Sequence, residues 1–207
     1  MKEQYSSSSS SSSTNIISSS SKLTPTSAIL SIGVVTFGLS VMVGPFIAPA
    51  FRKLTIPWMA TPTTIIRHAL HKIDKLPNNK IPINNRKLCD LGSGDGRFVI
   101  EAARAGYEKA VGIELNPWLV GYSYYKSWRA GVLSKVSFKM INFFDFDIRH
   151  FDVITCFGAN GIMEPLCIKV KKEGKDEALI VCYRFPLINK IPVVKDGELY
   201  IYNNKDI

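Results

Sequence analysis

The sequence predicts an α/β fold in which helices cover both faces of a parallel sheet. Two observations predict it: short apolar runs alternate with helix-like segments, and the first run leads through a glycine-rich turn into a helix. The expected strands are 88–91, 110–114, 136–140, 152–157 and 178–183. In such a sheet ligands bind at the carboxyl ends of the strands, where the glycine-rich turn is expected to lie.

Serine dominates residues 1–23, with an unbroken run from Ser6 to Ser13. Serine tracts lack the apolar surface that would offset the entropy of ordering a backbone, so we expect a disordered arm. Its only charged residues are Lys2, Glu3 and Lys22. The arm therefore does not match an arginine-rich mitochondrial presequence.

No charged residue occurs in the 24 positions 27–50, a length that can span a bilayer. We predict a transmembrane helix here; a cleaved signal peptide and a buried core helix are the alternatives. Basic residues precede it only at Lys2 and Lys22 but are frequent from Arg52 to Lys87, which places the following domain on the cytosolic or matrix side. This juxtamembrane cluster accounts for much of the net charge of +9, so we expect anionic lipid rather than nucleic acid as a partner.

The segment that follows opens the predicted catalytic domain, residues 55–207. Pro57 and Pro62 keep it extended, and a helix is expected to start with Thr63 or Thr64 as its N-cap. Its apolar residues fall largely on one face: Ile65, Ile66, Ala69, Leu70 and Ile73. Two interpretations are open, a linker with a packing helix or a lid over the glycine-rich turn.

The cysteines and histidines predict no metal site. No C-x-x-C motif is present, and the four cysteines are expected to be buried free thiols in a reducing compartment: Cys89, Cys156, Cys167 and Cys182. His68 and His71 can share a helix face, but no further ligand at suitable spacing joins them.

The glycine-rich turn indicates the cofactor. A dinucleotide site requires G-x-G-x-x-G, and its third glycine would fall on Arg97, which disfavours an NAD-linked oxidoreductase. Here the glycines are Gly92, Gly94 and Gly96, preceded by Asp90, and a second acid, Glu114, ends the next strand. This arrangement resembles that of S-adenosylmethionine-dependent methyltransferases, in which Asp90 would attract the donor's ammonium group and Glu114 would accept hydrogen bonds from its ribose hydroxyls.

A helix beginning at Pro117 is expected next, because proline is favoured at the first helical position. Its aromatic residues recur every three or four positions: Trp118, Tyr122, Tyr125 and Trp128. Such a stripe predicts either packing against the core or a wall of the cofactor site.

Several motifs together resemble one enzyme family. D-L-G-S-G-D-G-R, E-L-N-P-W-L-V, Y-S-x-Y-x-x-W-R-x-G and C-Y-R-F-P are similar to those of the mitochondrial protein-lysine N-methyltransferases that modify the c subunit of ATP synthase and the adenine nucleotide translocase. The resemblance implies a seven-strand Rossmann-like methyltransferase fold and S-adenosylmethionine as methyl donor. It also implies a single-pass anchor in the mitochondrial inner membrane, a domain facing the matrix, and a lysine of a membrane protein as substrate.

The family pattern assigns the site and shows two departures. By position, Asp90 and the three glycines line the donor. After the third strand the family tends to have an acid near adenine, whereas this chain has Asn142, which still accepts a hydrogen bond but carries no charge. After the fourth strand F-G-V-P is replaced by F-G-A-N, ending at Asn160. Asn160 and Trp58 are the candidate catalytic residues, the latter because an aromatic face can steady a cationic amine.

The departures leave two other functions open. A methyltransferase acting on RNA or a small amine would use the same donor loop. A membrane scaffold that binds the donor without transferring its methyl group would also retain the loop and explain the altered positions 142 and 157–160.

Overall fold

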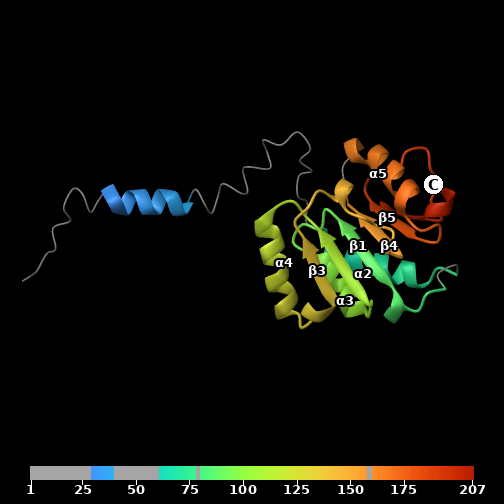
Figure 1. The fold of residues 1–207 in the computed structure, drawn as a ribbon. Helices are drawn as coiled ribbons and strands as arrows, with labels where there is room; N and C mark the ends of the chain where they lie inside the picture. The colour runs from blue at the N-terminus through green and yellow to red at the C-terminus, as the bar shows by residue number, and fades with distance from the viewer. Residues whose placement is uncertain (1–28, 40–60, 78–79, 158–159) are drawn as a thin grey trace, which may run out of the picture. The chain divides into compact units, whose positions relative to one another are not determined.

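A computed structural model describes residues 29–39, 61–77, 80–157 and 160–207. Its domain is built on a seven-stranded sheet with the order β3-β2-β1-β4-β5-β7-β6 (Figure 1). The strands are β1 (Lys87–Leu91), β2 (Lys109–Ile113), β3 (Val136–Lys139), β4 (Val153–Cys156), β5 (Leu179–Tyr183), β6 (Val194–Asp196) and β7 (Leu199–Asn203). The expected strands are confirmed as β1 to β5, with every end within one residue of its predicted position.

The sheet is mixed. Strands β1 to β5 run parallel, whereas β7 runs antiparallel to both β5 and β6. This Rossmann-like methyltransferase arrangement is the seven-strand fold that the family resemblance implies. Gly197, with a φ of 57°, helps turn β6 tightly into β7.

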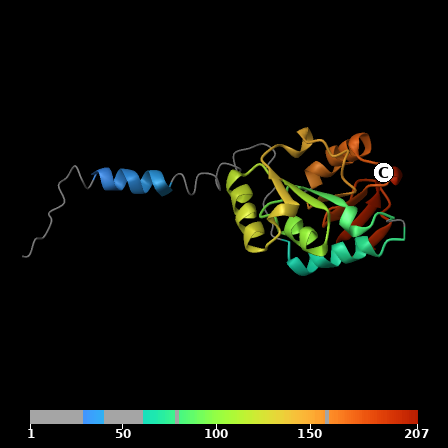
Figure 2. The same ribbon diagram turned by 60° about the horizontal axis from the view of Figure 1, so that its bottom comes forward.

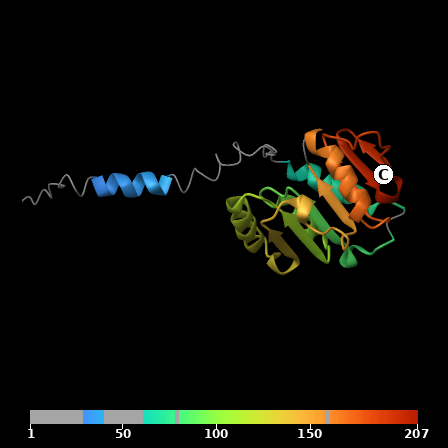
Figure 3. The same ribbon diagram turned by 45° about the horizontal axis from the view of Figure 1, so that its top comes forward.

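Helices cover both faces of the sheet. They are α2 (Thr63–Asp74), α3 (Arg97–Ala105), α4 (Pro117–Arg129) and α5 (Asn160–Glu173), with 3₁₀ turns η2 (Ile83–Asn85), η3 (Leu133–Lys135), η4 (Phe143–Asp145) and η5 (Asn204–Asp206). Figure 2 brings α2 and α3 forward on one face, and Figure 3 brings α5 forward on the other. The doubly wound arrangement is therefore confirmed.

Two apolar clusters fill the layers between sheet and helices. Successive strand residues point to opposite faces, so Leu88 joins the cluster beneath α2 and α3, whereas Cys89 joins the one beneath α5. The predicted apolar face of α2 is confirmed, since Ile66 and Ile73 have no exposed surface. The predicted N-cap is wrong: Pro62 takes that position without a side-chain cap, and its carbonyl accepts from the amides of Ile65 and Ile66.

Cys89, Cys156 and Cys182 are buried in β1, β4 and β5 as free thiols, and Cys167 is half-buried and free. The expectation of free thiols is confirmed, with the exception that Cys167 is not fully buried. Burial raises the pKa of the Cys89 and Cys182 thiols, which keeps both protonated and unreactive.

Residues 29–39 form a helix in a separate unit of the chain. Among the described residues, no helix combines the length and the apolar character needed to cross a membrane. The predicted arm 1–23, the remainder of the predicted span 27–50, and Trp58 lie outside the described residues.

Candidate functional site

The glycine-rich turn lies where the strand order changes direction. β1 pairs with β2 on one side and with β4 on the other, and the loop 92–96 leaves the carboxyl end of β1 between them. In doubly wound sheets a ligand binds in the crevice at this point. The loop then enters α3, whose first turn presents backbone amides toward the same edge.

The three loop glycines adopt backbone conformations that other residues rarely adopt. Their φ angles are 81° at Gly92, 53° at Gly94 and 72° at Gly96. A Cβ on Gly92 would meet nothing within 4 Å, whereas one on Gly96 would lie 2.7 Å from the Cβ of Ser123. Gly92 therefore keeps the crevice open, and Gly96 allows α4 to pack closely on the loop.

Two further residues hold the loop, and the sequence assigns this role to neither of them. A Cβ on Gly112 of β2 would lie 2.6 Å from the Ser93 hydroxyl, so only glycine permits this approach. Ser123 of α4 is fully buried, and its hydroxyl donates to the carbonyl of Gly94 over 3.2 Å. The loop is clamped between β2 and α4.

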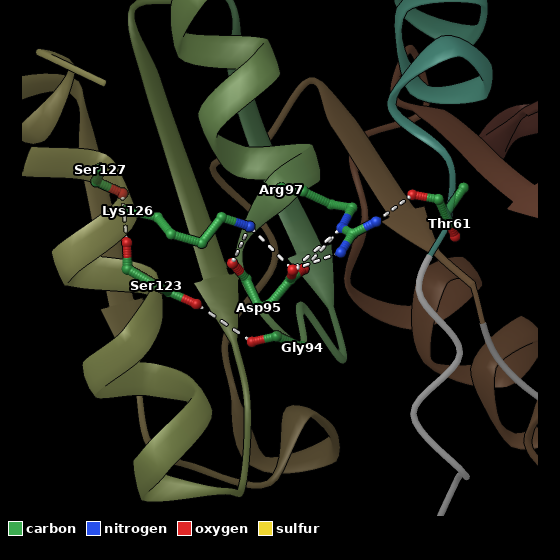
Figure 4. Close-up of polar contacts among 7 residues, drawn as sticks. All are labelled: Thr61, Gly94, Asp95, Arg97, Ser123, Lys126 and Ser127. Atoms are coloured by element: carbon green, nitrogen blue, oxygen red, sulfur yellow. Dashed lines mark hydrogen bonds and ion pairs between the residues drawn. The ribbon is translucent and has the colours of Figure 1, made fainter. Parts of the chain in front are cut away.

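A charged cluster holds the base of the loop (Figure 4). The Nη2 of Arg97 donates to Oδ2 of Asp95 over 2.6 Å, and Nζ of Lys126 donates to the same oxygen over 2.9 Å. Nη1 of Arg97 donates to the carbonyl of Thr61 over 2.9 Å, just before α2. Burial tends to raise the pKa of the Asp95 carboxyl, but the Arg97 and Lys126 hydrogen bonds outweigh it and hold this pKa below its ordinary value.

Asp90 differs, because its hydrogen-bond partner is a neutral hydroxyl rather than a cation. The Thr155 hydroxyl of β4 donates to its Oδ1 over 2.5 Å. Burial raises the pKa of the Asp90 carboxyl to about 7; the Thr155 hydrogen bond opposes this rise, whereas the nearby charge of Glu114 adds to it. Asp90 is thus a buried carboxyl that an ammonium group would stabilise as an anion.

Glu114 follows β2 and both of its carboxylate oxygens accept backbone hydrogen bonds. Oε2 accepts from the Gly94 amide over 3.0 Å, and Oε1 accepts from the amides of Leu115 and Asn116 over 2.8 and 2.9 Å. One acceptor position on Oε2 remains. Glu114 therefore both shapes the loop and offers an acceptor where a ribose would lie.

The other predicted site residues are placed less completely. Asn142 caps η4, its side-chain oxygen accepting from the Phe144 amide over 3.1 Å. Asn160 begins α5, which follows β4 at the carboxyl edge of the sheet. Positions 158–159 and Trp58 lie outside the described residues. The structure thus brings Asp90, the glycines and Glu114 together, and it sets Asn142 at the same edge, after β3.

The aromatic stripe of α4 does not fill the core, so the prediction of core packing is wrong, whereas a wall of the cofactor site stays a prediction. Trp118, Tyr122, Tyr125 and Trp128 are between 41% and 65% exposed, which is more than a core position allows. The buried residues of α4 are instead Ser123 and Ser127. Their small side chains fit the narrow gap over the loop, which aromatic rings cannot enter. The expected helix start is confirmed, with Asn116 as N-cap and Pro117 first.

The site fits S-adenosylmethionine by its own chemistry. The space over Gly92 admits a ligand, the Asp90 carboxyl matches an ammonium group, and Glu114 matches ribose hydroxyls. A pyrophosphate-binding loop would need a third glycine at position 97, where this chain has Arg97. Within the described parts of the chain, His, Cys, Asp and Glu form no cluster able to hold a metal ion.

A protein-family model described as the ANTKMT methyltransferase domain matches residues 90–194 of this chain, from Asp90 in β1 to the start of β6. The chain belongs to this family. Among its relatives, a lysine N-methyltransferase of Xenopus laevis that is named for the ATP synthase c subunit is 36% identical, over 81% of this chain and 70% of that protein. The adenine nucleotide translocase lysine N-methyltransferase of Mus musculus is 32% identical, over 72% of this chain and 64% of that protein.

A solved structure also matches this ANTKMT-family domain. It is an RNA methyltransferase from Salinibacter ruber in complex with S-adenosyl-L-homocysteine, with 28% sequence identity and a TM-score of 0.63. The match covers 70% of this chain and 92% of that one. Together with the family, this neighbour identifies S-adenosylmethionine as the cofactor.

Proposed function

We propose that this chain transfers a methyl group from S-adenosylmethionine to the ε-amine of a lysine in a mitochondrial membrane protein, such as the c subunit of ATP synthase or the adenine nucleotide translocase. The observation that carries the proposal is the relationship to lysine N-methyltransferases across the whole donor site, from Asp90 to β6. The two departures, at Asn142 and at 157–160, lie outside Asp90, the glycines and Glu114.

The donor, when bound, supplies an electrophilic methyl group on a sulfonium. In the transfer, the neutral lysine nitrogen forms a bond to the methyl carbon, the carbon–sulfur bond breaks, and its electron pair stays on sulfur; a proton leaves the nitrogen. This in-line displacement requires alignment rather than a protein nucleophile. Asp90 would hold the ammonium group and Glu114 the ribose hydroxyls of the donor, and the glycine backbone would give it room.

The acceptor side is assigned by position. Asn160 begins α5 at the edge where the methyl group would lie, so we assign it to orient the amine. Trp58 would face the cationic product with its aromatic ring. The Thr61 carbonyl accepts a hydrogen bond from Arg97, which places Thr61 beside the donor loop. We therefore propose that the segment from Trp58 to Thr61 covers the donor and acceptor.

We also propose that residues 27–50 anchor the chain in the mitochondrial inner membrane as a single span, with the domain facing the matrix. The 24 uncharged positions and the basic residues that follow support this topology. In this location a lysine near a membrane surface is within reach of the domain.

The test is labelling of mitochondrial inner-membrane proteins by the full chain and isotope-labelled S-adenosylmethionine, with mass spectrometry to locate the methylated residue. We expect label on a lysine. Gly92→Arg fills the donor space and Glu114→Ala removes the ribose acceptor, so both should abolish labelling, whereas Gly121→Ala, on the exposed side of α4, should not. A fully active Gly92→Arg variant would refute the donor site.

The likeness to an RNA methyltransferase favours RNA as a second candidate substrate. The same labelling reaction with mitochondrial RNA decides between a protein lysine and RNA as the substrate. Label on RNA and not on protein would overturn the lysine proposal. Donor binding without transfer to protein, RNA or small amines would instead indicate a scaffold, as the changes at 142 and 157–160 allow.

A further inference from the structure

Helix α4 buries serines rather than aromatic residues, and Val120 is its apolar contact with the core. Its fully buried residues are Ser123 and Ser127, whose hydroxyls donate to the carbonyls of Gly94 and Ser123 over 3.2 and 2.7 Å. The opposite side carries what we call the aromatic face: Trp118, Tyr122, Tyr125 and Trp128. A surface helix normally turns its apolar side inward. Each of the four residues is at least 41% exposed, so a partner can reach these rings.

The rings of the aromatic face form one surface. The centroids of Tyr122 and Tyr125 lie 6.3 Å apart, as do those of Tyr125 and Trp128. Trp128 is 65% exposed, although such a ring buries a large apolar area when it finds a partner. All four are tryptophan or tyrosine, which join an apolar ring to a polar N–H or O–H and prefer the interface between lipid and water.

The stretch of sequence that contains the aromatic face carries charges of one sign. From residue 115 to residue 144 the chain has no acid, but it carries Lys126, Arg129, Lys135 and Lys139. Nη1 of Arg129 donates to the Tyr125 hydroxyl over 3.2 Å, so this cation lies beside the rings. Lys126 lies 5.5 Å from the centroid of the Tyr122 ring. Lys126 is already paired with the buried Asp95, so Arg129 is the cation beside these rings that can meet an anionic surface such as lipid phosphates.

We propose that the aromatic face of α4 binds the surface of an anionic bilayer, with its rings at the headgroup level and Arg129 on lipid phosphates. The inference rests on the proposed location beside a membrane and names the surface that meets it. The serine side of α4 packs on the donor loop through the Ser123–Gly94 hydrogen bond. Since a helix with its side chains is about 10 Å across, the donor loop then lies about that far from the lipid.

The test uses the full chain with Trp58→Phe and Trp118→Phe, which leaves Trp128 as the sole tryptophan. It is mixed with vesicles of phosphatidylcholine and cardiolipin whose acyl chains carry bromine, a short-range quencher. We expect the emission of Trp128 to shift to shorter wavelength and to be quenched. The matched control adds Trp128→Phe and Ile191→Trp, which moves the tryptophan to a site that is 87% exposed, before β6. Its emission should stay unquenched.

Both proteins keep residues 27–50, so insertion of that segment alone cannot produce a difference between them. In the Trp128 chain, Arg129→Gln should lower the equilibrium constant for seating α4 on cardiolipin vesicles roughly fivefold, because one cation near an anionic surface contributes about that factor. Vesicles of phosphatidylcholine alone should show little effect of this substitution.

Three outcomes would overturn the proposal. In the first, the emission of Trp128 stays unquenched on cardiolipin vesicles. In the second, it is quenched no more than the emission of the Ile191→Trp control. In the third, the shift in emission wavelength appears without vesicles, or only when a purified membrane protein is added. Binding of S-adenosylhomocysteine is measured in the same chains. If the Trp128 chain binds this product but is not quenched, while the parent chain with Trp58 in place labels lysine, the membrane-surface proposal is refuted and the proposed function stands.

Discussion

Asp90 carries the pH dependence expected of the donor site. Burial raises the pKa of its carboxyl from an ordinary 3.8 to about 7, so the empty site is largely protonated below neutrality. An ammonium group pairs only with the ionised form. We predict that affinity for S-adenosylhomocysteine, measured by calorimetry, rises roughly tenfold per pH unit up to about pH 7 and then levels off.

Asp90→Asn is the matching variant. It keeps an oxygen that can accept from Thr155, but it cannot ionise, so affinity should fall by roughly 10- to 100-fold and lose its dependence on pH. The stability of the ligand-free protein changes with pH in the opposite direction to donor affinity. Because the raised pKa favours the protonated folded state, the ligand-free protein should lose stability as pH rises from about 4 to about 7. An Asp90→Asn protein with the same pH dependence as the parent would contradict both expectations.

The glycines allow a matched series. Gly92→Ala places a methyl group in open space at a φ of 81°, so it should cost only about 1–2 kcal/mol of stability but lower donor affinity roughly tenfold or more. Gly96→Ala meets Ser123 at 2.7 Å and should cost more than 2 kcal/mol, about the sum of strain and overpacking.

Gly121→Ala is the control, since its methyl group meets nothing within 4 Å on the helix and should add about 0.5–1 kcal/mol of stability. Chemical denaturation and calorimetry separate the two properties. Equal donor affinity in Gly92→Ala and Gly121→Ala would show that the donor does not approach the Gly92 backbone.

At the residue scale, the sequence identified those site residues that follow a strand end at a recognisable spacing. Asp90, Gly92 and Glu114 belong to this group. The sequence does not assign Thr155, Ser123 or Gly112 to the site, because each meets it from another strand or helix. Ser123 belongs to the Y-S-x-Y motif, but the motif alone does not give its role. Such contacts arise only from the order and packing of elements in the fold.

At the scale of elements, Arg97 joins the donor loop to the start of α2 through Asp95 and the Thr61 carbonyl. We predict that Arg97→Gln speeds amide hydrogen exchange at Ile65 and Ile66, the first turn of α2, and weakens donor binding. Charge-assisted hydrogen bonds of this kind contribute about 1.5–3 kcal/mol, and the partial exposure of Arg97 places the loss at the lower end.

The chain contains a matched control for the contacts of Arg97 with Asp95 and Thr61. Arg149 pairs with Asp147 at the same spacing of two residues and with the same two-pronged geometry, but 69% of its side chain is exposed. Arg149→Gln should leave exchange in α2 and donor affinity unchanged. If Arg97→Gln behaves in the same way, the Thr61 contact does not hold α2 to the loop.

The boundaries of elements were largely predictable, whereas the faces of helices were less so. Apolar runs bounded by turn residues located β1 to β5 within one residue, because burial on both faces of a parallel sheet requires such runs. The aromatic stripe of α4 predicts core packing or a wall of the cofactor site, and the structure contradicts the core packing of its rings. Close packing of Gly96 on Ser123 leaves no room for them, and this contact between distant segments was not visible in the sequence.

At the scale of the whole molecule, the two apolar clusters meet across the sheet on which the donor site is built, so donor binding and global stability should be coupled. A ligand at about 100 times its dissociation constant stabilises the folded state by about 2.7 kcal/mol, which for a chain of this size corresponds to a rise in Tm of roughly 5–10 °C.

We predict this rise for S-adenosylhomocysteine and none for NAD, measured by differential scanning calorimetry of the full chain. Glu114→Ala should reduce the rise, because it removes both the ribose acceptor and the anchor of the Gly94 amide. A rise in Tm with NAD would support an NAD-linked oxidoreductase, which the arginine at position 97 disfavours. A chain whose Tm is unchanged by S-adenosylhomocysteine would have no functional donor site, because binding to the folded state alone must raise its Tm.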